Sequence, residues 1–297
     1  MKIRLFLAGS LLSALLFTSC SKDDPSSGSA FSNGPAELPA LATSGNHKFV
    51  SHSTTVGGQE VNTFSLEYDL DKKHARWVAF KFYNTTGQTT VGRSDEPFGP
   101  DPLVGTSSQR VQADFGRKGY DRGHLCASAD RLYSETANEQ TFYYTNMSPQ
   151  KNSFNTGIWR ELEAAVQNWG RSNVFRDTLY VVKGASIDRK EHIWTYIDGD
   201  QTKPVPKYYF MALLNKKGDR FKAIAFWLDQ SKTYGSKEKL SNYAITVDEL
   251  EELTGIDFFH NLNDELESGV EAQFSANAWN GTVSYTHLRA HETKANL

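Results

Sequence analysis

Apolar and polar residues alternate in short runs from residue 48 onward, and such runs predict β-strands. Five of these runs are rich in β-branched and aromatic residues, and they lie at residues 48–53, 61–68, 76–83, 208–214 and 220–228. The last two flank Asn215 and Gly218, so they predict a hairpin. Residues 141–146 and 178–182 predict two further strands, and residues 147–150 predict a turn.

Two segments carry the spacing of amphipathic helices. The first begins near Asn155, where we expect an N-cap. Its apolar stripe consists of Trp159, Leu162, Val166 and Trp169. The second helix spans residues 246–255 and ends at Gly255. Because strands outnumber helices, the pattern predicts an α+β fold.

Residues 84–112 interrupt this pattern. The segment is rich in Gly, Pro, Asp and Ser and shows no period, so it predicts a long loop. Long loops inside compact domains often carry function, and we expect this loop to border the site.

The N-terminal residues predict export. Residues 1–19 carry Lys2 and Arg4 before an apolar stretch that is too short for a comfortable membrane span. Ser19 then precedes Cys20, an arrangement that resembles a bacterial lipoprotein signal with Cys20 as the acylated residue. An ordinary secretory signal with a free cysteine is the alternative. We expect an outer-membrane lipoprotein that faces the periplasm or the cell surface, with a flexible tether at residues 20–47.

Composition and charge limit the class of protein. The chain has 297 residues, of which 38% are hydrophobic and 23% charged, and this balance favours one globular domain at residues 48–281. The net charge of -3 excludes a protein that coats nucleic acid electrostatically. Cys126 is expected as a buried small hydrophobe. The tail at residues 282–297 has no period, and we expect it to lie outside the fold.

Candidate chemistry is concentrated between residues 120 and 163. His124 titrates near neutrality, which suits a general base, and Arg122 offers paired N–H donors to a phosphate. The alternative for residues 121–124, Asp-Arg-Gly-His, is a surface turn with an ion pair. Asn155 could serve as an oxygen ligand of a cation or only as a helix cap. In a regular helix Glu163 would lie about 12 Å from it along the axis and about 80° around it, so Glu163 would act through metal-bound water or be only an exposed charge.

Three linked motifs carry a family resemblance. They are YDRGHL at residues 120–125, NMSPQ at 146–150, and the set Asn155, Gly157, Trp159, Leu162 and Glu163. Together they resemble the DNA/RNA non-specific endonuclease family, the ββα-metal or His-Me finger nucleases, over residues 77–279. The resemblance implies a central antiparallel sheet flanked by helices.

The resemblance also implies roles for particular residues. His124 would be the general base, Asn155 the direct ligand of Mg²⁺ with Mn²⁺ as an alternative, and Glu163 a ligand through water. Arg122 would contact phosphate or support the turn, and Asn146 would position the base or the phosphate. Arg93 in the long loop would bind phosphate.

One position departs from the family pattern. Gln167 stands where the family often has an arginine. Either Arg160 or Arg171 would take that role here, or the transition state would be stabilised less and the rate would be lower. Residues 110–160 contain seven basic and five acidic side chains, so the site region is slightly basic within a negative chain. We therefore expect a modest, salt-dependent affinity for nucleic acid, with few contacts that distinguish one base from another.

These observations predict a Mg²⁺-dependent endonuclease that cleaves DNA and RNA to 5′-phosphate and 3′-hydroxyl ends. Its partners would be the two nucleic acids and, through Cys20, a membrane, with a homodimer left open. Two alternatives remain at this stage. One is a non-enzymatic envelope lipoprotein that binds nucleic acid, and the other is a metal phosphodiesterase for small substrates.

Overall fold

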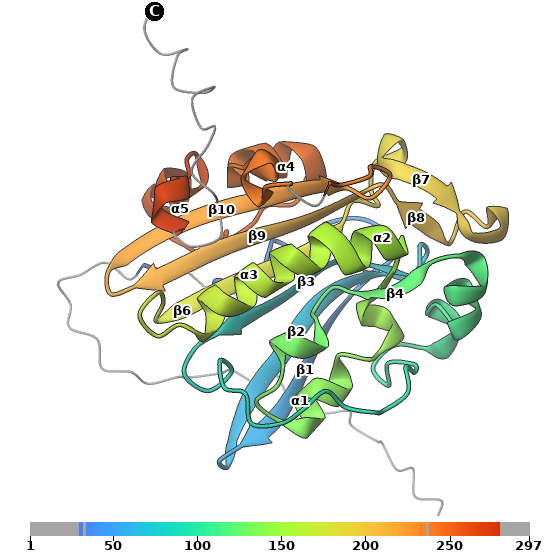
Figure 1. Ribbon diagram of the computed structural model, residues 1–297, viewed down its shortest axis with the longest axis horizontal. Coiled ribbons are helices and arrows are strands. Elements are labelled where there is room, and N and C mark those ends of the chain that lie inside the picture. The colour runs from blue at the N-terminus through green and yellow to red at the C-terminus, as the bar shows by residue number, and fades with distance from the viewer. Residues whose placement is uncertain (1–29, 32–33, 236–237, 280–297) are drawn as a thin grey trace, which may run out of the picture.

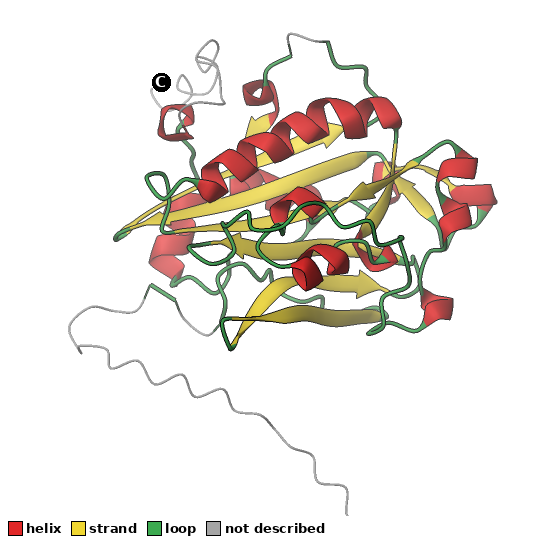
Figure 2. Cartoon of the chain, turned by 60° about the horizontal axis from the view of Figure 1, so that its bottom comes forward, coloured by secondary structure: helices red, strands yellow, loops and turns green. Residues whose placement is uncertain are grey.

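The computed structural model describes residues 30–31, 34–235 and 238–279, and a seven-stranded sheet forms its middle layer (Figures 1 and 2). Every neighbouring pair of strands in this sheet is antiparallel. In spatial order the strands are β1 (His47–Val56), β2 (Gln59–Asp69), β3 (His74–Phe82), β6 (Thr178–Ala185), β9 (Tyr208–Lys217), β10 (Arg220–Asp229) and β11 (Ala244–Ile245). The six strands predicted at residues 48–53, 61–68, 76–83, 178–182, 208–214 and 220–228 are confirmed.

Two small antiparallel sheets complete the strand structure. One pairs β4 (Asp121–His124) with β5 (Met147–Gln150), and the other pairs β7 (Ile193–Tyr196) with β8 (Pro204–Pro206). The strand predicted at residues 141–146 is wrong, because that segment ends in a 3₁₀ turn, and the turn predicted at 147–150 is the strand β5. Pro149 is tolerated there because a two-stranded sheet has only edge strands.

A long irregular helical segment follows β5. It consists of α2 (Asn152–Phe154), a wide turn at Asn155–Trp159 and α3 (Arg160–Arg171). The predicted N-cap at Asn155 is wrong: the chain is already helical there, with φ -59° and ψ -46°, and the Asn155 N–H donates to the Lys151 carbonyl at 2.9 Å. Gly157 leaves the helical region at φ -101° and ψ -118°, so the rotation of a regular helix does not relate Asn155 to Glu163.

Three further helices are α1 (Glu135–Gln140), α4 (Val247–Thr254) and α5 (Asp264–Glu271). The helix predicted at residues 246–255 is confirmed as α4. Thr246 caps its first turn by accepting a hydrogen bond from the Glu249 N–H at 3.0 Å, and Gly255 ends it with a left-handed φ of 70°.

The sheet separates two hydrophobic cores. The core under α3 contains its predicted stripe together with Phe80 of β3 and Val181 of β6. The core on the other face contains Ala79, Val182, and apolar residues of α4 and α5. Adjacent strand residues thus face opposite cores, as the period of two requires, and Figure 1 shows α3 on one side of the sheet with α4 and α5 on the other. Each fully buried large apolar side chain contributes about 1.5 to 3 kcal/mol to this packing.

The folded part begins before residue 48, the expected boundary of the domain. Ala36 and Glu37 are buried, Glu37 pairs with the Lys81 ammonium at 2.9 Å, and the Ala40 N–H donates to the Asp257 carbonyl at 2.9 Å. The predicted signal, Cys20, residues 20–29 of the tether and the tail at 282–297 lie outside the described residues. Among the described residues, no helix combines the length and the apolar character needed to cross a membrane.

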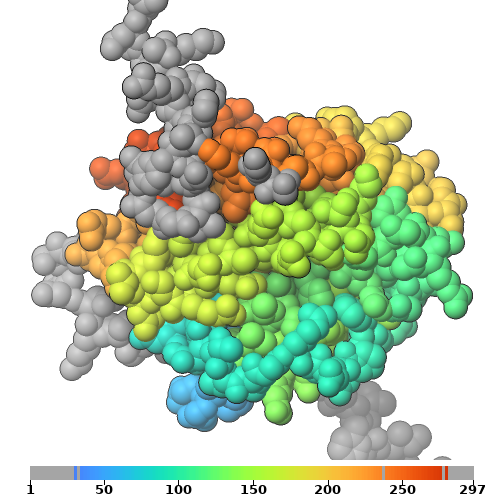
Figure 3. All heavy atoms as spheres, viewed as in Figure 1, coloured from blue at the N-terminus to red at the C-terminus, as the bar shows by residue number. Residues whose placement is uncertain are grey.

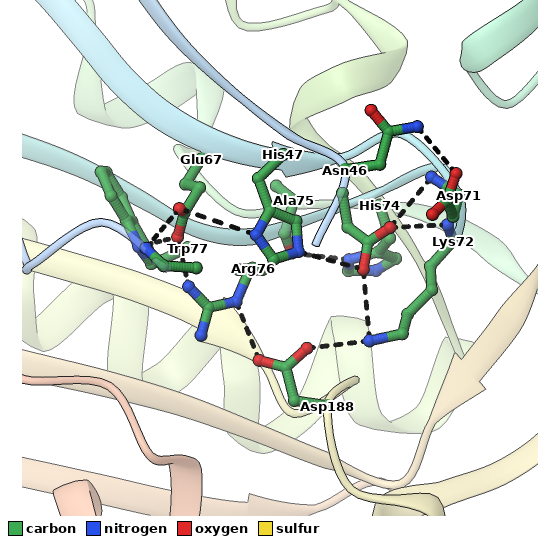
Figure 4. Close-up of polar contacts among 12 residues, drawn as sticks. Asn46, His47, Glu67, Asp71, Lys72, His74, Ala75, Arg76, Trp77 and Asp188 are labelled. Carbon is green, nitrogen blue, oxygen red and sulfur yellow. Dashed lines mark hydrogen bonds and ion pairs between the residues drawn. The ribbon is translucent and has the colours of Figure 1, made fainter. Parts of the chain in front are cut away.

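A charged cluster fastens the first strands of the sheet to the loop after β6 (Figure 4). Glu67 accepts hydrogen bonds from Arg76 and from the Trp77 indole. Asp188 accepts from Arg76 Nε at 2.8 Å and from Lys72 Nζ at 2.9 Å. Burial opposes ionisation of Asp188, but these two cations outweigh it and hold the pKa of its carboxyl below the usual value. Asp188 therefore contributes to the fold in its ionised form.

A buried hydrogen-bond chain ties β5 to the large sheet. His74 Nδ1 donates to the Ala75 carbonyl at 2.7 Å, so His74 Nε2 accepts from the Ser148 hydroxyl at 2.7 Å. The Tyr209 hydroxyl lies 2.7 Å from Ser148 Oγ and 2.9 Å from the Pro149 carbonyl. Burial, and then the charge of Arg110, lower the pKa of His74 to about 3. The chain therefore depends on a neutral imidazole.

Acid should weaken this chain. Above about pH 6.5, the ordinary pKa of a histidine, both folded and unfolded chains keep the imidazole neutral, but below it only the unfolded chain takes up a proton until the pH approaches 3. The stability advantage of the wild type over His74→Gln should therefore shrink by roughly 3 kcal/mol between pH 7 and pH 4. Urea unfolding of both proteins across this range measures it, and a constant difference would show that His74 titrates normally.

Candidate active site

A cavity of about 580 Å³ opens where strand β4 meets the start of α3. In Figure 3 the yellow-green residues of α3 and the blue-green residues of the long loop before β4 lie on either side of a shallow hollow. The sequence-predicted residues that line the cavity are Arg93, Arg122, His124, Asn155, Arg160, Glu163 and Gln167. The fold thus brings together residues from the loop, from β4 and from the helical segment.

His124 ends β4 and lies between two aromatic rings. Its imidazole centre is 5.5 Å from that of Phe98 and 5.4 Å from that of Phe142, which meets it edge-on at 89°. Nε2 is buried without a hydrogen-bond partner, whereas Nδ1 is not among the buried atoms. Burial first, and then the charges of Arg93, Lys183 and Arg122, lower the pKa of His124 to about 3. The imidazole is therefore neutral near pH 7 and can accept a proton at Nδ1.

Gly123 is required by the pairing of β4 with β5. It lies opposite Ser148 in the ladder, and a Cβ at this position would overlap the Gln150 side chain. The absence of a side chain at Gly123 therefore allows the neighbouring strand to approach closely. Arg122 and His124 lie on either side of this glycine, and both line the cavity.

Two arginines provide positive charge at the cavity. The Arg122 guanidinium lies 4.0 Å from the centre of the Phe98 ring and donates to Gln112 Oε1 at 2.6 Å. The exposed Arg93 guanidinium lies 4.7 Å from the centre of the Phe142 ring. The two rings that flank His124 therefore also carry the two arginines.

Asn155 is oriented by Asp121 of β4. The Asn155 amide nitrogen donates to Asp121 Oδ2 at 2.9 Å, and Asn152 donates to the same oxygen at 3.0 Å. Because a carboxylate only accepts, this hydrogen bond fixes which end of the Asn155 amide is nitrogen. Asn155 Oδ1 is left as the free acceptor at the cavity wall.

Glu163 lies beside a buried lysine that sequence reasoning missed. Lys183 of β6 is fully buried, with Nζ 2.7 Å from Asp130 Oδ2 and 3.5 Å from Glu163 Oε1. Burial, reinforced by the charge of Asp130, outweighs Lys183 and raises the pKa of Glu163 above its usual value. The only sequence signal for Lys183 was a lysine within an otherwise apolar strand.

Gln167, which stands where the family often has an arginine, uses its side chain in a contact within the protein. Its side-chain amide donates to Asp130 Oδ1 at 2.9 Å, so it belongs to the Lys183–Asp130 cluster. Arg171 donates to the Ala129 carbonyl and does not line the cavity, whereas the exposed Arg160 does. Arg160 is therefore the only one of the two expected substitutes that reaches the site.

Asn146 lies behind the cavity and does not line it. It is fully buried, accepts from the Cys126 N–H at 2.8 Å, and donates to the carbonyls of Cys126 and Thr141 at 2.8 and 2.7 Å. Of the two roles expected for Asn146, this geometry fits positioning of the chain after His124 and leaves no polar atom for a phosphate. Cys126 is buried and its thiol pKa is raised to about 12 by burial, which fits the expected packing role.

The cavity offers ligands that suit a hard divalent cation. Asn155 Oδ1 is an unused amide oxygen, and the Glu163 carboxylate lines the cavity while its Oε1 faces the Lys183 ammonium at 3.5 Å. Oxygen atoms of these two types are the ligands that Mg²⁺ binds, together with several waters. The residues present therefore fit a hydrated metal ion held by few protein atoms.

The chain is similar in sequence to known nucleases. The model of the DNA/RNA non-specific endonuclease family matches residues 45–265. A nuclease of Nostoc sp. is 30% identical over 219 residues, which cover 71% of this chain and 76% of the relative. Mitochondrial endonuclease G of Caenorhabditis elegans is 27% identical over 247 residues, which cover 80% of this chain and 78% of the relative.

The fold matches a solved structure as well. The crystal structure of the EndoG/EndoGI complex contains a chain with a TM-score of 0.60 and 22% identity, covering 72% of this chain and 88% of that one. The expected α+β fold of a ββα-metal nuclease, with a central antiparallel sheet flanked by helices, is thereby confirmed.

Proposed function

The chain is an endonuclease that belongs to the DNA/RNA non-specific endonuclease family, and from this premise we propose that it uses Mg²⁺ and His124 to cleave both nucleic acids. The observation that carries the proposal is the placement of His124 in one cavity with Asn155, Glu163 and three arginines, Arg93, Arg122 and Arg160. Membership in the family sets aside the non-enzymatic alternative. No contact among the described residues favours small diesters over nucleic acid.

In the proposed reaction, the oxygen of a water attacks the phosphorus while His124 Nδ1 takes the proton of that water. The bond from phosphorus to the 3′ oxygen breaks, and this oxygen takes a proton from a solvent water, which leaves a 5′-phosphate and a 3′-hydroxyl. His124 then returns its proton to solvent. Proton transfer of this kind contributes about 10² to 10⁴ in rate. Phe98 and Phe142 hold the ring, so the base does not have to be ordered when substrate arrives.

Other side chains bind and orient. Arg93 and Arg122 lie beside His124 and would neutralise the phosphate, and the exposed Arg160 would add charge from α3. The divalent cation, held by Asn155 Oδ1 and through water by Glu163, would supply charge at the phosphate and at the leaving oxygen. Lys183 is a positioning residue, because it contacts Glu163 from behind the cavity.

The base assignment can be tested on plasmid DNA and on RNA. His124→Ala should lower kcat on both substrates by at least about 100-fold with Mg²⁺ present, because no other neutral imidazole lines the cavity in the described residues. His260→Ala, which changes a half-buried histidine away from the cavity, is the control and should keep wild-type rates. Full activity of His124→Ala would overturn the mechanism.

The metal assignment can be tested through Asp121. Asp121→Asn keeps the shape of the side chain but gives it an amide that can also donate, so the orientation of the Asn155 amide is no longer fixed. The Mg²⁺ concentration for half-maximal activity should rise by about 10 to 100-fold. Titration of the nuclease rate with Mg²⁺ measures this, and an unchanged midpoint would mean that Asn155 is oriented by another contact.

We also propose, from the sequence, that residues 1–19 are removed and that Cys20 carries the lipid anchor of an outer-membrane protein. In the cells that express it, wild-type protein should fractionate with membranes and Cys20→Ala should not. Equal fractionation of the two would exclude lipidation of Cys20.

A further inference from the structure

A second cluster of carboxylates lies on the opposite face of the sheet from the cavity. Ligand oxygens of Asp248, Glu251 and Glu271 all lie within 4.8 Å of one another. Asp248 and Glu251 are three positions apart on α4 and so share one side of that helix, and Glu271 is the last residue of α5. The two helices cover the same face of the sheet in Figure 1.

Glu271 is the unusual member. Only 4% of the residue is exposed, and its Oε1 is buried without a hydrogen-bond partner. Burial of a carboxylate without a donor or a cation is strongly unfavourable. Its position at the C-terminal end of α5 adds to this, because the helix dipole is negative there. The fold alone therefore leaves this side chain without a stabilising contact.

The charged groups that act most strongly on Glu271 are other carboxylates. The pKa of Glu271 is raised to about 9. Burial is the largest cause, and the carboxylates of Glu251, Glu267, Asp248 and Asp257 add to it. Within the described residues, none of the three clustered carboxylates forms an ion pair with a basic side chain. Glu251 has one donor, the Phe258 N–H at 2.7 Å from its Oε1.

We propose that Asp248, Glu251 and Glu271 bind a Ca²⁺ ion that holds α5 against α4. Two ligand atoms at about 2.4 Å from one ion can be at most about 4.8 Å apart, and the separation within this cluster meets that limit. Three carboxylates supply up to six oxygens, which suits the six to eight ligands of Ca²⁺. Mg²⁺ prefers one or two carboxylates and keeps several waters, so the cluster selects Ca²⁺.

This site is independent of the nuclease cavity, from which the sheet separates it. Its ion would stabilise the folded chain by binding only when α4 and α5 are in place. It would also restore the ionised form of Glu271, which the empty cluster disfavours.

The experiment uses the full-length folded protein carrying Asn155→Ala, so that binding in the nuclease cavity is removed. After treatment with EDTA, this protein should bind one Ca²⁺ per chain in equilibrium dialysis, and CaCl₂ should raise its Tm by several degrees. MgCl₂ at the same concentration should raise it less. Adding Glu271→Gln should abolish both the binding and the Tm shift.

Glu271→Gln has a second expected effect that distinguishes ion binding from loss of structure. In EDTA this variant should melt at a higher temperature than its parent, because an amide is neutral in the folded and unfolded chains and so avoids the cost of burying or protonating a carboxylate there. Glu252→Gln changes an exposed carboxylate on α4 outside the cluster, and it should keep the full response to Ca²⁺. If Glu271→Gln does not fold, Asp248→Asn at an exposed position takes its place.

The proposal is overturned if Ca²⁺ neither binds nor shifts the Tm of the Asn155→Ala protein, which would mean that the Glu271 carboxyl is simply protonated. It is also overturned if Glu271→Gln and Asp248→Asn respond to Ca²⁺ as their parent does. Neither result bears on the nuclease assignment, which plasmid cleavage with Mg²⁺ measures separately.

Discussion

The arrangement of the active-site region depends on the ion pairs that the buried Lys183 ammonium forms with Asp130 and Glu163. Lys183 lies on β6 and contacts Asp130, which follows the His124 strand, and Glu163, which belongs to α3. Asp130 in turn accepts from Gln167 and from the Ala127 N–H. A charge removed from water must be matched closely by opposite charge, and removing one partner of such a pair typically destabilises a protein by about 3 to 5 kcal/mol. The sheet, the loop and the helix are therefore held in one arrangement.

Sequence reasoning succeeded where local pattern and local structure coincide. The central strands are buried on both faces and consist of runs of apolar and aromatic residues, and α4 carries its own capping residues, so both could be predicted from the sequence. β5 was missed because Met147–Gln150 contains a proline and is held by its pairing with β4 and by the buried Ser148 hydroxyl. The relation of Asn155 to Glu163 was misjudged because one glycine, Gly157, departs from helical geometry. Lys183 and Glu271 could not be found, because their partners lie on other elements of the chain.

The net charge of -3 is an average over two different faces. Arg93, Arg122 and Arg160 gather at the cavity, while residues 247–271, which form α4, α5 and the link between them, contain nine acidic residues and no lysine or arginine. A polyanion approaching the molecule would be attracted at the cavity and repelled at the far face. The overall charge therefore does not predict which surface a nucleic acid approaches. The distribution of charge between the two faces of the sheet predicts an approach to the cavity.

The packing of residues 34–40 has a geometric consequence for the orientation of the enzyme. Ala36 belongs to the core covered by α4 and α5, and Ala40 is bonded to Asp257 next to α4. The chain therefore enters the domain on the face away from His124. The point of entry is separated from the cavity by the seven-stranded sheet, so a partner bound at that point would leave the cavity open.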